Sequence, residues 1–282
     1  MLKDQIVVIT GATDGIGKVA ARELFKKGYS LALVGRNQSK LNAVKSELDG
    51  LASGNSIQLF QADLSLVSET HRIGLEIAKV YPKIYSLLNN AGAFFSERAI
   101  TSEGLESTFA LNHLNYFVLA HNLLPSLEKF GKSRIVNVAS RAHKGVSLDF
   151  SNLQGETAYS GWKQYQRSKL MNIYFSYSLS ERLKDKGISV NCLHPGFVKT
   201  KFGHNNLGLA KHLINLGQNL FAINEDKGAE TSIFLVSSPE VDGITGKYFD
   251  ECKEVKSSKE SYDRKAEKTL WDHSEKLIAS LK

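Results

Sequence analysis

The sequence predicts a single α/β domain in which a doubly wound parallel sheet is covered by helices on both faces. Two observations support this fold class. Short apolar runs rich in β-branched residues alternate with segments of helical periodicity from the N-terminus onward. Across the 282 residues, no Pro/Ser/Gly-rich linker, internal repeat or low-complexity tract interrupts the alternation. Short apolar strands between helices of this length are typical of parallel sheets with right-handed crossovers.

The first half of the chain supplies four predicted strands with helices between them. The apolar side chains of the first helix recur at helical spacing and share one side of it, and Gly28 gives this helix a C-terminal stop. The strands are predicted at residues 5–10, 30–35, 56–62 and 84–89, and the helices at residues 15–28, 39–51 and 65–81.

The second half continues the alternation with two long helices. The first is predicted at residues 103–130 and is expected to bend at Pro125, because a proline removes a backbone hydrogen bond inside a helix. A strand at residues 134–140, a helix at residues 161–186 and a strand at residues 188–193 follow.

Two later segments have no assigned place in the sheet. Residues 201–223 carry apolar side chains among Gly and Asn, and three interpretations are open: a substrate lid, a membrane-touching surface or an ordinary packing helix. Residues 253–282 form a basic segment, predicted to be helical, in which basic residues are interleaved with acids. Such a segment is consistent with a solvated surface or with peripheral membrane contact.

Composition is that of an ordinary globular protein, with 42% hydrophobic and 23% charged residues. Cys192 and Cys252 are too few for a disulfide framework or a Cys-based zinc site, and they indicate a reducing compartment. We expect neither a signal peptide nor a transmembrane span, and hence a cytoplasmic protein, because no run of about eighteen apolar residues occurs. The net charge of +7 comes without a nucleic-acid motif, so nucleic acid is not an expected partner.

A glycine-rich turn between the first predicted strand and helix indicates a dinucleotide site in a Rossmann-type fold. Residues 10–17 read Thr-Gly-Ala-Thr-Asp-Gly-Ile-Gly, with the spacing Gly-x-x-x-Gly-x-Gly. Glycines let the backbone approach a pyrophosphate, and the helix N-terminus offers N–H groups and a positive dipole end to that anion. The residues expected to bind the cofactor here are Gly11, Thr13, Asp14, Gly15, Ile16 and Gly17.

The end of the second predicted strand indicates which dinucleotide is bound. An NAD site usually has Asp or Glu here to bond the ribose 2′-hydroxyl group. No acid occurs from Val34 to Lys40, and Arg36 offers a guanidinium group suited to a 2′-phosphate. The sequence therefore favours NADP(H) over NAD(H).

A tyrosine and a lysine on the long helix at residues 161–186 indicate proton transfer. Tyr165 and Lys169 are four residues apart and share one helix face. A phenol has an ordinary pKa of about 10, which a nearby ammonium group is expected to lower, making the hydroxyl a usable acid and base. Tyr159 and Lys163 have the same spacing, so the pattern alone leaves two pairs open.

The order of motifs along nearly the whole chain resembles the short-chain dehydrogenase/reductase family. The glycine turn is followed by Asn89-Asn90-Ala91-Gly92, Asn112 within Leu-Asn-His, Ser140 closing Ile-Val-Asn-Val-Ala-Ser, Tyr165 with Lys169, and Pro-Gly-Phe-Val-Lys-Thr at residues 195–200. The family's tyrosine typically lies in Tyr-x-x-Ser-Lys, which Tyr165 matches and Tyr159 does not. The resemblance thus selects Tyr165 and Lys169.

The resemblance also implies a role for each residue. Ser140 is expected to hydrogen-bond the substrate carbonyl oxygen, and Tyr165 to exchange a proton with it. Lys169 is expected to lower the tyrosine pKa and to bond the nicotinamide ribose. Asn112 is expected to anchor a water relay to Lys169 from a local distortion in its helix. The other implied cofactor contacts are Asp63 to the adenine, Asn90 on the adenosine side, and Val198 and Thr200 at the carboxamide. No metal is implied.

Two motifs near the C-terminus resemble the retinol-dehydrogenase branch of this family: Gly-Lys-Tyr-Phe-Asp-Glu-Cys at residues 246–252 and Leu-Trp-Asp-His-Ser-Glu at residues 270–275. The resemblance implies hydride transfer between an apolar aldehyde or ketone, retinoid-like compounds included, and its alcohol. The alternative is a non-catalytic NADP(H)-binding sensor or scaffold on the same fold. In many relatives the helices that match residues 103–130 and 161–186 pair between subunits, which implies a homo-oligomer.

Overall fold

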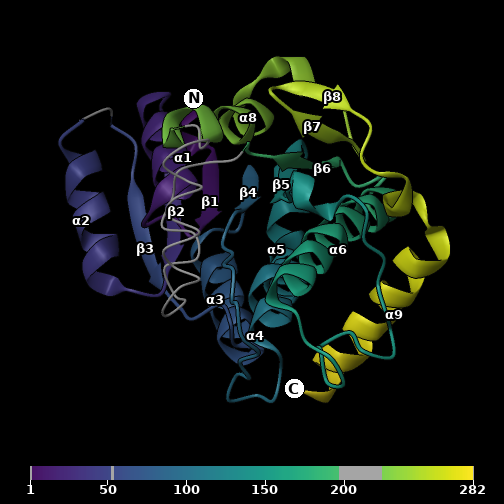
Figure 1. Cartoon of the computed structure of the whole chain (residues 1–282). Coiled ribbons are helices and arrows are strands. Elements are labelled where there is room, and N and C mark those ends of the chain that lie inside the picture. The colour runs from purple at the N-terminus through teal and green to yellow at the C-terminus, as the bar shows by residue number, and fades with distance from the viewer. Residues whose placement is uncertain (1, 52–53, 197–223, 282) are drawn as a thin grey trace.

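The sheet contains eight strands in the order β3-β2-β1-β4-β5-β6-β7-β8 (Figure 1). The structure is a computed structural model that describes residues 2–51, 54–196 and 224–281. All neighbouring strands are parallel except β7 and β8. The strands are β1 Ile6–Thr10, β2 Ser30–Gly35, β3 Ile57–Gln61, β4 Ser86–Asn89, β5 Ser133–Val138, β6 Ile188–His194, β7 Tyr248–Asp250 and β8 Lys253–Val255. The strand order reverses direction at β1 and β4, as in a doubly wound sheet, so the predicted fold class is confirmed.

Helices cover both faces of this sheet (Figure 1). α1, α2 and α8 contribute side chains to the core on one face, and α3, α5 and α6 to the core on the other. The helices are α1 Gly15–Lys26, α2 Gln38–Asp49, α3 Val67–Val80, α4 Ser107–Phe109, α5 Asn115–Phe130, α6 Gly161–Arg182, α8 Glu225–Ser237 and α9 Arg264–Ser280.

The central strand β1 shows why the strands read as continuous apolar runs. Val7 and Ile9 are fully buried in the core beneath α1, whereas Val8 is fully buried in the opposite core. Successive side chains of a strand point to opposite faces, and both faces are covered by helices, so every position of the strand favours an apolar side chain.

The helix predicted at residues 103–130 begins later than expected. Its first turn, α4, starts at Ser107, because the carboxylate of Glu106 caps it by accepting hydrogen bonds from two N–H groups of α4, both at 2.8 Å. Gly104, with a φ of +78°, keeps the preceding residues out of the helix. The helix is also interrupted by a π-helical turn at Ala110–Leu114 before α5 begins.

The C-terminal segment is only partly helical, contrary to the prediction for residues 253–282. It begins with β8, which pairs antiparallel with β7 because a two-residue turn joins them, and only its second half forms α9. The indole of Trp271 in α9 lies 4.8 Å from the ring centre of Phe117 in α5 and 6.2 Å from that of Phe175 in α6. The guanidinium of Arg182 lies 4.0 Å from the same indole. Part of the α5–α6 surface, which was expected to pair between subunits, is therefore buried under α9 of the same chain.

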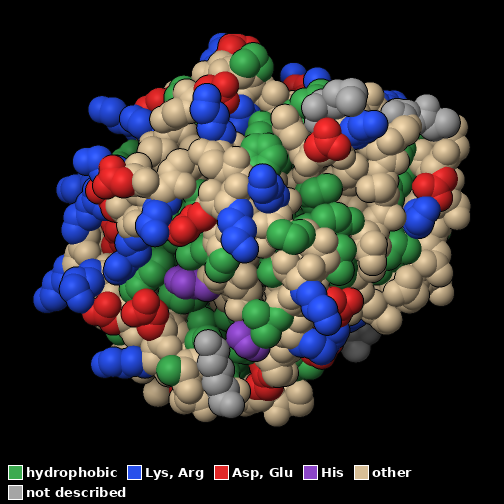
Figure 2. All heavy atoms as spheres, turned by 180° about the vertical axis from the view of Figure 1, so that it is seen from behind, with side chains coloured by type: hydrophobic (Ala, Val, Ile, Leu, Met, Phe, Trp, Pro, Cys, Tyr) green, Lys and Arg blue, Asp and Glu red, His purple; other side chains and the backbone are tan. Residues whose placement is uncertain are grey.

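Some charges of the C-terminal segment form local ion pairs. Lys247 pairs with Glu254, Lys268 with Asp272, and Arg264 with Glu267. Basic and acidic side chains are interspersed on the face seen in Figure 2. None of the helices in the described part of the chain is long and apolar enough to cross a membrane.

The turn between β7 and β8 generates a prediction about stability. Glu251 and Cys252 both have positive φ, 47° and 61°, which ordinary side chains rarely adopt. Asn and Gly are the residues that such a two-residue turn favours. We expect the double substitution Glu251→Asn/Cys252→Gly to raise the free energy of unfolding by about 1–2 kcal/mol in urea denaturation. Glu254→Asn, at a position without positive φ, is the control and should bring no gain; equal stability of the double variant and the wild type would contradict the prediction.

Candidate active site

Three of the predicted site residues lie beyond the carboxyl ends of β1, β4 and β5. β1 pairs with β4 and β4 pairs with β5, all in parallel, so the segments that follow these strands lie at one edge of the sheet. Gly11, Asn90 and Ser140 belong to these three segments. The topology thus brings together residues that are far apart in the sequence.

The glycine turn after β1 leaves no room for side chains at Gly11 and Gly17. Gly11 has a φ of +66°, in the left-handed region that favours glycine. A Cβ atom on Gly17 would lie 2.3 Å from the carbonyl oxygen of Gly11 and 2.5 Å from Nδ2 of Asn90. The turn therefore presents bare backbone at the N-terminus of α1, which fits the pyrophosphate of a dinucleotide.

Thr13, Gly15 and Ile16 complete the turn and begin α1. Thr13 lies against the end of β2, where a Cβ atom on Gly35 would be only 2.9 Å from its Cγ2. Gly15 has a φ of +52° and is the first residue of α1. Ile16 is partly buried against the core on this face. The side chains of Thr13 and Ile16 position the turn, and its backbone N–H groups remain the feature that suits an anion.

Asn90 ties the end of β4 to the glycine turn. Its Nδ2 donates hydrogen bonds to the carbonyl oxygens of Thr10, at 2.9 Å, and of Gly11, at 3.4 Å. In return, Oγ1 of Thr10 accepts from the backbone N–H groups of Asn90 and Ala91, each at 2.9 Å. Asn90 thus stabilises the turn by holding its backbone, a role in shaping the predicted cofactor site.

Asp14 occupies the N-cap position of α1, but its side chain does not cap the helix. Its carboxylate instead accepts a hydrogen bond from Nζ of Lys40, at 2.6 Å, which brings a cation of α2 to the mouth of the turn. Lys40 was not among the predicted site residues. The signal that identifies it is a second basic residue one helical turn beyond Arg36.

Arg36 and Asp63 lie together at the ends of β2 and β3. The guanidinium of Arg36 is 3.7 Å from the carboxylate of Asp63, and its side chain is 73% exposed. Asp63 also accepts hydrogen bonds from the N–H group and the hydroxyl of Ser65, at 3.0 and 2.7 Å. An exposed guanidinium held this loosely is available to a phosphate group.

Ser140, Tyr165 and Lys169 come together where α6 crosses the segment after β5. Tyr165 is 8% exposed and Lys169 is 4% exposed. Nζ of Lys169 lies 5.6 Å from the centre of the Tyr165 ring and donates a hydrogen bond to the carbonyl oxygen of Val138, at 3.3 Å. The side chain of Ser140, two residues further on, hydrogen-bonds Tyr165.

The electrostatics of this pair differ from the expectation. Burial raises the pKa of Tyr165 well above 10, and the hydrogen bond with Ser140 offsets only part of that effect. Burial also lowers the pKa of Lys169 to about 8. The expectation that Lys169 brings the pKa of Tyr165 below its ordinary value is therefore wrong for the chain by itself. The physical reason is that the same packing removes both groups from water, which disfavours the phenolate and the ammonium alike.

Asn112 lies in the π-helical turn Ala110–Leu114, at the kind of helix distortion that the family resemblance implied. Its Oδ1 accepts from the N–H group of Ala93 at 2.8 Å, and its Nδ2 donates to the carbonyl oxygen of Ala93 at 2.9 Å and to the hydroxyl of Ser168 at 3.0 Å. A Cβ atom on Gly92 would lie 3.2 Å from Oδ1 of Asn112 and 3.5 Å from Nζ of Lys169. Asn112 and Lys169 therefore face the same short segment after β4.

The second tyrosine–lysine pair does not form. Tyr159 precedes α6, and its hydroxyl donates to Oε1 of Glu106 at 3.3 Å. Burial raises the pKa of Tyr159 to about 12, with the Glu106 carboxylate adding to the effect. Lys163 is exposed on α6. The structure thus separates two motifs that the spacing alone could not tell apart.

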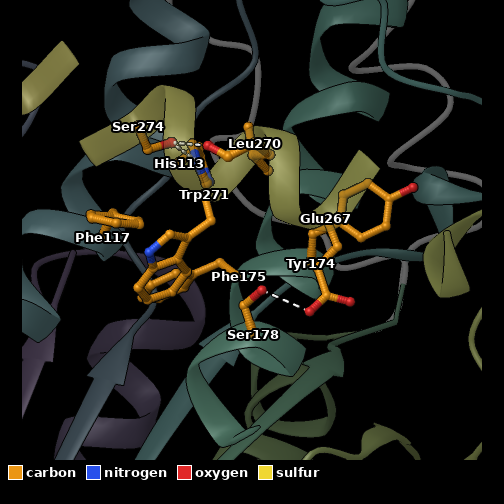
Figure 3. A pocket seen from close by; sticks show the side chains of 9 residues that line it. All are labelled: His113, Phe117, Tyr174, Phe175, Ser178, Glu267, Leu270, Trp271 and Ser274. Carbon is orange, nitrogen blue, oxygen red and sulfur yellow. Dashed lines mark hydrogen bonds between the residues drawn. The ribbon is translucent and has the colours of Figure 1, made fainter. Parts of the chain in front are cut away.

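The buried histidines near the site pack by hydrogen bonds. Nδ1–H of His143 donates to the carbonyl oxygen of Ser140 at 2.5 Å, and Nδ1 of His194 accepts from the N–H group of Arg141 at 3.1 Å. His113 bonds Ser274 of α9 at 3.1 Å, and burial lowers its pKa to about 3. Figure 3 shows this histidine in a crevice between α5, α6 and α9, where Trp271 and Phe175 fill the space beside it. The crevice is too narrow for a substrate, so it is a packing seam and separate from the active site.

Three predictions lie outside the described residues: the cofactor contacts Val198 and Thr200, and the segment at residues 201–223 that was considered as a lid.

Comparisons with known proteins agree with this geometry. The sequence model of a family described as short chain dehydrogenase matches residues 5–207. Retinol dehydrogenase 14 of Homo sapiens is 34% identical over 297 residues, which cover 100% of this chain and 88% of that protein. Retinol dehydrogenase 12 of Mus musculus is 31% identical over 277 residues, which cover 97% of this chain and 86% of that protein. A crystal structure of an uncharacterized protein from Mycobacterium Paratuberculosis superposes with a TM-score of 0.78 at 27% identity, over 98% of this chain and 93% of that one.

Burial of Lys169 generates a prediction about the pH dependence of stability. The pKa of Lys169 is lowered to about 8 in the folded protein, whereas an unfolded lysine titrates near 10.4, so the unfolded state binds more protons between these pH values. The contribution of Lys169 to the free energy of unfolding therefore becomes more favourable as the pH rises from about 8 to about 10.4. The Lys169→Met variant should be more stable than the wild type at pH 7, and the difference should shrink between pH 8 and 10 by up to about 1.4 kcal/mol per pH unit.

Urea denaturation of both proteins at several pH values measures this difference. Lys163→Met, which removes an exposed lysine of the same helix, should show a difference from the wild type that does not change with pH. A constant difference for Lys169→Met between pH 8 and 10 would show that Lys169 titrates normally.

Proposed function

This chain belongs to the short-chain dehydrogenase family, in its retinol-dehydrogenase branch, and we propose that it interconverts an apolar carbonyl compound and its alcohol with NADP(H), using Tyr165 as the general acid and base. Membership of the family makes the chain an oxidoreductase that acts on carbonyl or alcohol groups with a nicotinamide cofactor. The choice of NADP(H), the proton donor and the nature of the substrate are the parts that we propose.

The observation that carries the proposal is the cluster of the half-buried Ser140 with the buried Tyr165 and Lys169. A bound nicotinamide supplies a hydride to, or takes one from, the carbon atom of the substrate. Negative charge develops on the substrate oxygen during reduction, and the hydroxyl groups of Ser140 and Tyr165 are the donors placed to stabilise it. Tyr165 then transfers its proton to that oxygen, and in oxidation it takes the proton back.

Tyr165 carries its proton at neutral pH and is therefore in the form that a proton donor needs. Lys169, with a pKa of about 8, exchanges protons readily near physiological pH and lies on the same helix face. We assign it the replacement of the proton that Tyr165 gives up. Asn112 holds the segment after β4 that both Lys169 and the glycine turn contact.

The basic side chains at the ends of β2 and in α2 support NADP(H) as the cofactor. Arg36 is 73% exposed at the position where an acid would bind the ribose of NAD. Lys40 adds a second cation beside Asp14. The substrate class is proposed from the relatives, whose names give retinol as their substrate.

Tyr165→Phe is the test of the proton donor. It removes only the hydroxyl group, so we expect kcat for reduction of retinal by NADPH, followed at 340 nm, to fall by about 100-fold or more, with little change in the Kd for NADPH. Tyr159→Phe is the matched control and should lose much less activity. If Tyr165→Phe kept most of the wild-type rate, another proton donor would be required. Tight NADPH binding without turnover of any aldehyde, ketone or alcohol would favour the non-catalytic sensor.

Arg36→Gln is the test of cofactor choice. Loss of the guanidinium removes a charge-assisted contact to the 2′-phosphate, so KM for NADPH should rise about tenfold or more while KM for NADH changes little. Lys45→Gln, which removes a cation paired with Asp49 along the same α2, should leave both KM values unchanged. A wild-type preference for NADH, or an equal rise of both KM values in Arg36→Gln, would overturn NADP(H) as the cofactor.

A further inference from the structure

Tyr165 is the inner member of a cluster of three aromatic side chains. The ring of Trp162 stacks on that of Tyr165, with centroids 5.8 Å apart and an interplanar angle of 28°. Phe94 stands edge-on to both, at 6.0 Å from Tyr165 with an angle of 88° and at 6.4 Å from Trp162 with an angle of 67°. The proposed proton donor is therefore in contact with two aromatic rings from two different segments of the chain.

Close backbone packing places these rings together. A Cβ atom on Gly161, the first residue of α6, would lie 2.3 Å from the carbonyl oxygen of Phe95 and 2.6 Å from that of Ser96. The hydroxyl of Tyr159 donates to the same carbonyl of Phe95 at 3.5 Å. The start of α6 is thus pressed against the segment that carries Phe94, and Trp162 follows Gly161 directly. The relative position of the three rings is set by backbone contacts.

The exposure of the three rings is unequal. Phe94 is 9% exposed and Tyr165 is 8% exposed, but Trp162 is 52% exposed. The other tryptophan of the chain, Trp271, is 4% exposed and is enclosed by α5, α6 and α9. Trp271 is thus a buried packing residue, whereas about half of the surface of Trp162 is exposed next to the proposed proton donor.

We propose that Trp162 is a specificity-determining residue, whose exposed indole stacks on the planar conjugated part of a carbonyl substrate while the substrate oxygen reaches Tyr165. This inference rests on the proposed function and names the part of the substrate that its site selects. An indole attracts a flat π-system placed against its face or edge. A saturated chain with tetrahedral carbons beside the carbonyl group makes fewer such contacts. Trp162 therefore favours aldehydes and ketones whose carbonyl group is conjugated with a double bond or an aromatic ring.

The kinetic test compares two aldehydes with the same carbon skeleton. Cinnamaldehyde is planar and conjugated, whereas 3-phenylpropanal carries a saturated link between its ring and its carbonyl group. Trp162→Ala should lower the ratio of their kcat/KM values, cinnamaldehyde over 3-phenylpropanal, by about fivefold, chiefly through KM for cinnamaldehyde. Trp162→Phe should keep most of the wild-type ratio because it retains an aromatic face. Leu75→Ala, which changes an apolar side chain on α3 that is also 52% exposed, is the control and should leave the ratio unchanged.

A binding test separates this inference from the proposed chemistry. Calorimetric titration of the NADP⁺-loaded protein with cinnamamide, an unreactive planar analogue, needs no proton transfer. Its Kd should rise about fivefold in Trp162→Ala, and the Kd of 3-phenylpropanamide should not. If Tyr165→Phe proves active but this difference persists, the proton donor is wrong and the role of Trp162 stands. If Trp162→Ala alters neither the kinetic ratio nor the Kd of cinnamamide, or alters both members of each pair equally, the role of Trp162 is refuted.

Discussion

The short segment after β4 holds the two halves of the site together. Asn90 bonds the backbone of the glycine turn, and Ala93 exchanges two hydrogen bonds with Asn112 in the π-helical turn. Gly92, between them, lies so close to Asn112 that an added Cβ would crowd its side chain, and the same Cβ would touch Nζ of Lys169. The glycine turn and the helix that carries Tyr165 are therefore positioned by one piece of backbone, and both depend on small or amide-bearing residues in it.

Burial is the second constraint on the site, because it shifts the pKa values of Tyr165 and Lys169. The packing that brings Tyr165 and Lys169 together also removes them from water, which raises the pKa of the phenol and lowers the pKa of the amine. The proposed proton donor is thus a neutral phenol beside an amine whose pKa is lowered by burial. The cofactor end of the site has the opposite character, because Arg36 and Lys40 remain exposed and charged where an anion would bind.

The remainder of the chain supports this site from outside. α9 encloses Trp271 against α5 and α6, and Ser274 of α9 bonds His113, the neighbour of Asn112 in the π-helical turn. The C-terminal helix is thus in contact with the element that presents Asn112. This link was not visible in the sequence, where Ser274 and His113 are far apart and neither residue type is diagnostic.

The sequence by itself determined the features that depend on local spacing. Periodicity and residue types a few positions apart predict strands β1 and β2 and the glycine turn. They also predict that Tyr165 and Lys169 share one helix face. Spacing alone, by contrast, did not distinguish Tyr165 from Tyr159, and the sequence analysis used a family resemblance to choose Tyr165. The fold adds a physical difference, because Tyr159 bonds Glu106 and Lys163 is exposed to solvent. Other features were decided by the tertiary structure alone. They are the direction of the Tyr165 pKa shift, the approach of Lys40 to Asp14, the late start of α4 and the stacking of Trp162 on Tyr165. Each depends on burial or on contact between segments distant in the chain, and neither quantity is encoded by spacing along one segment.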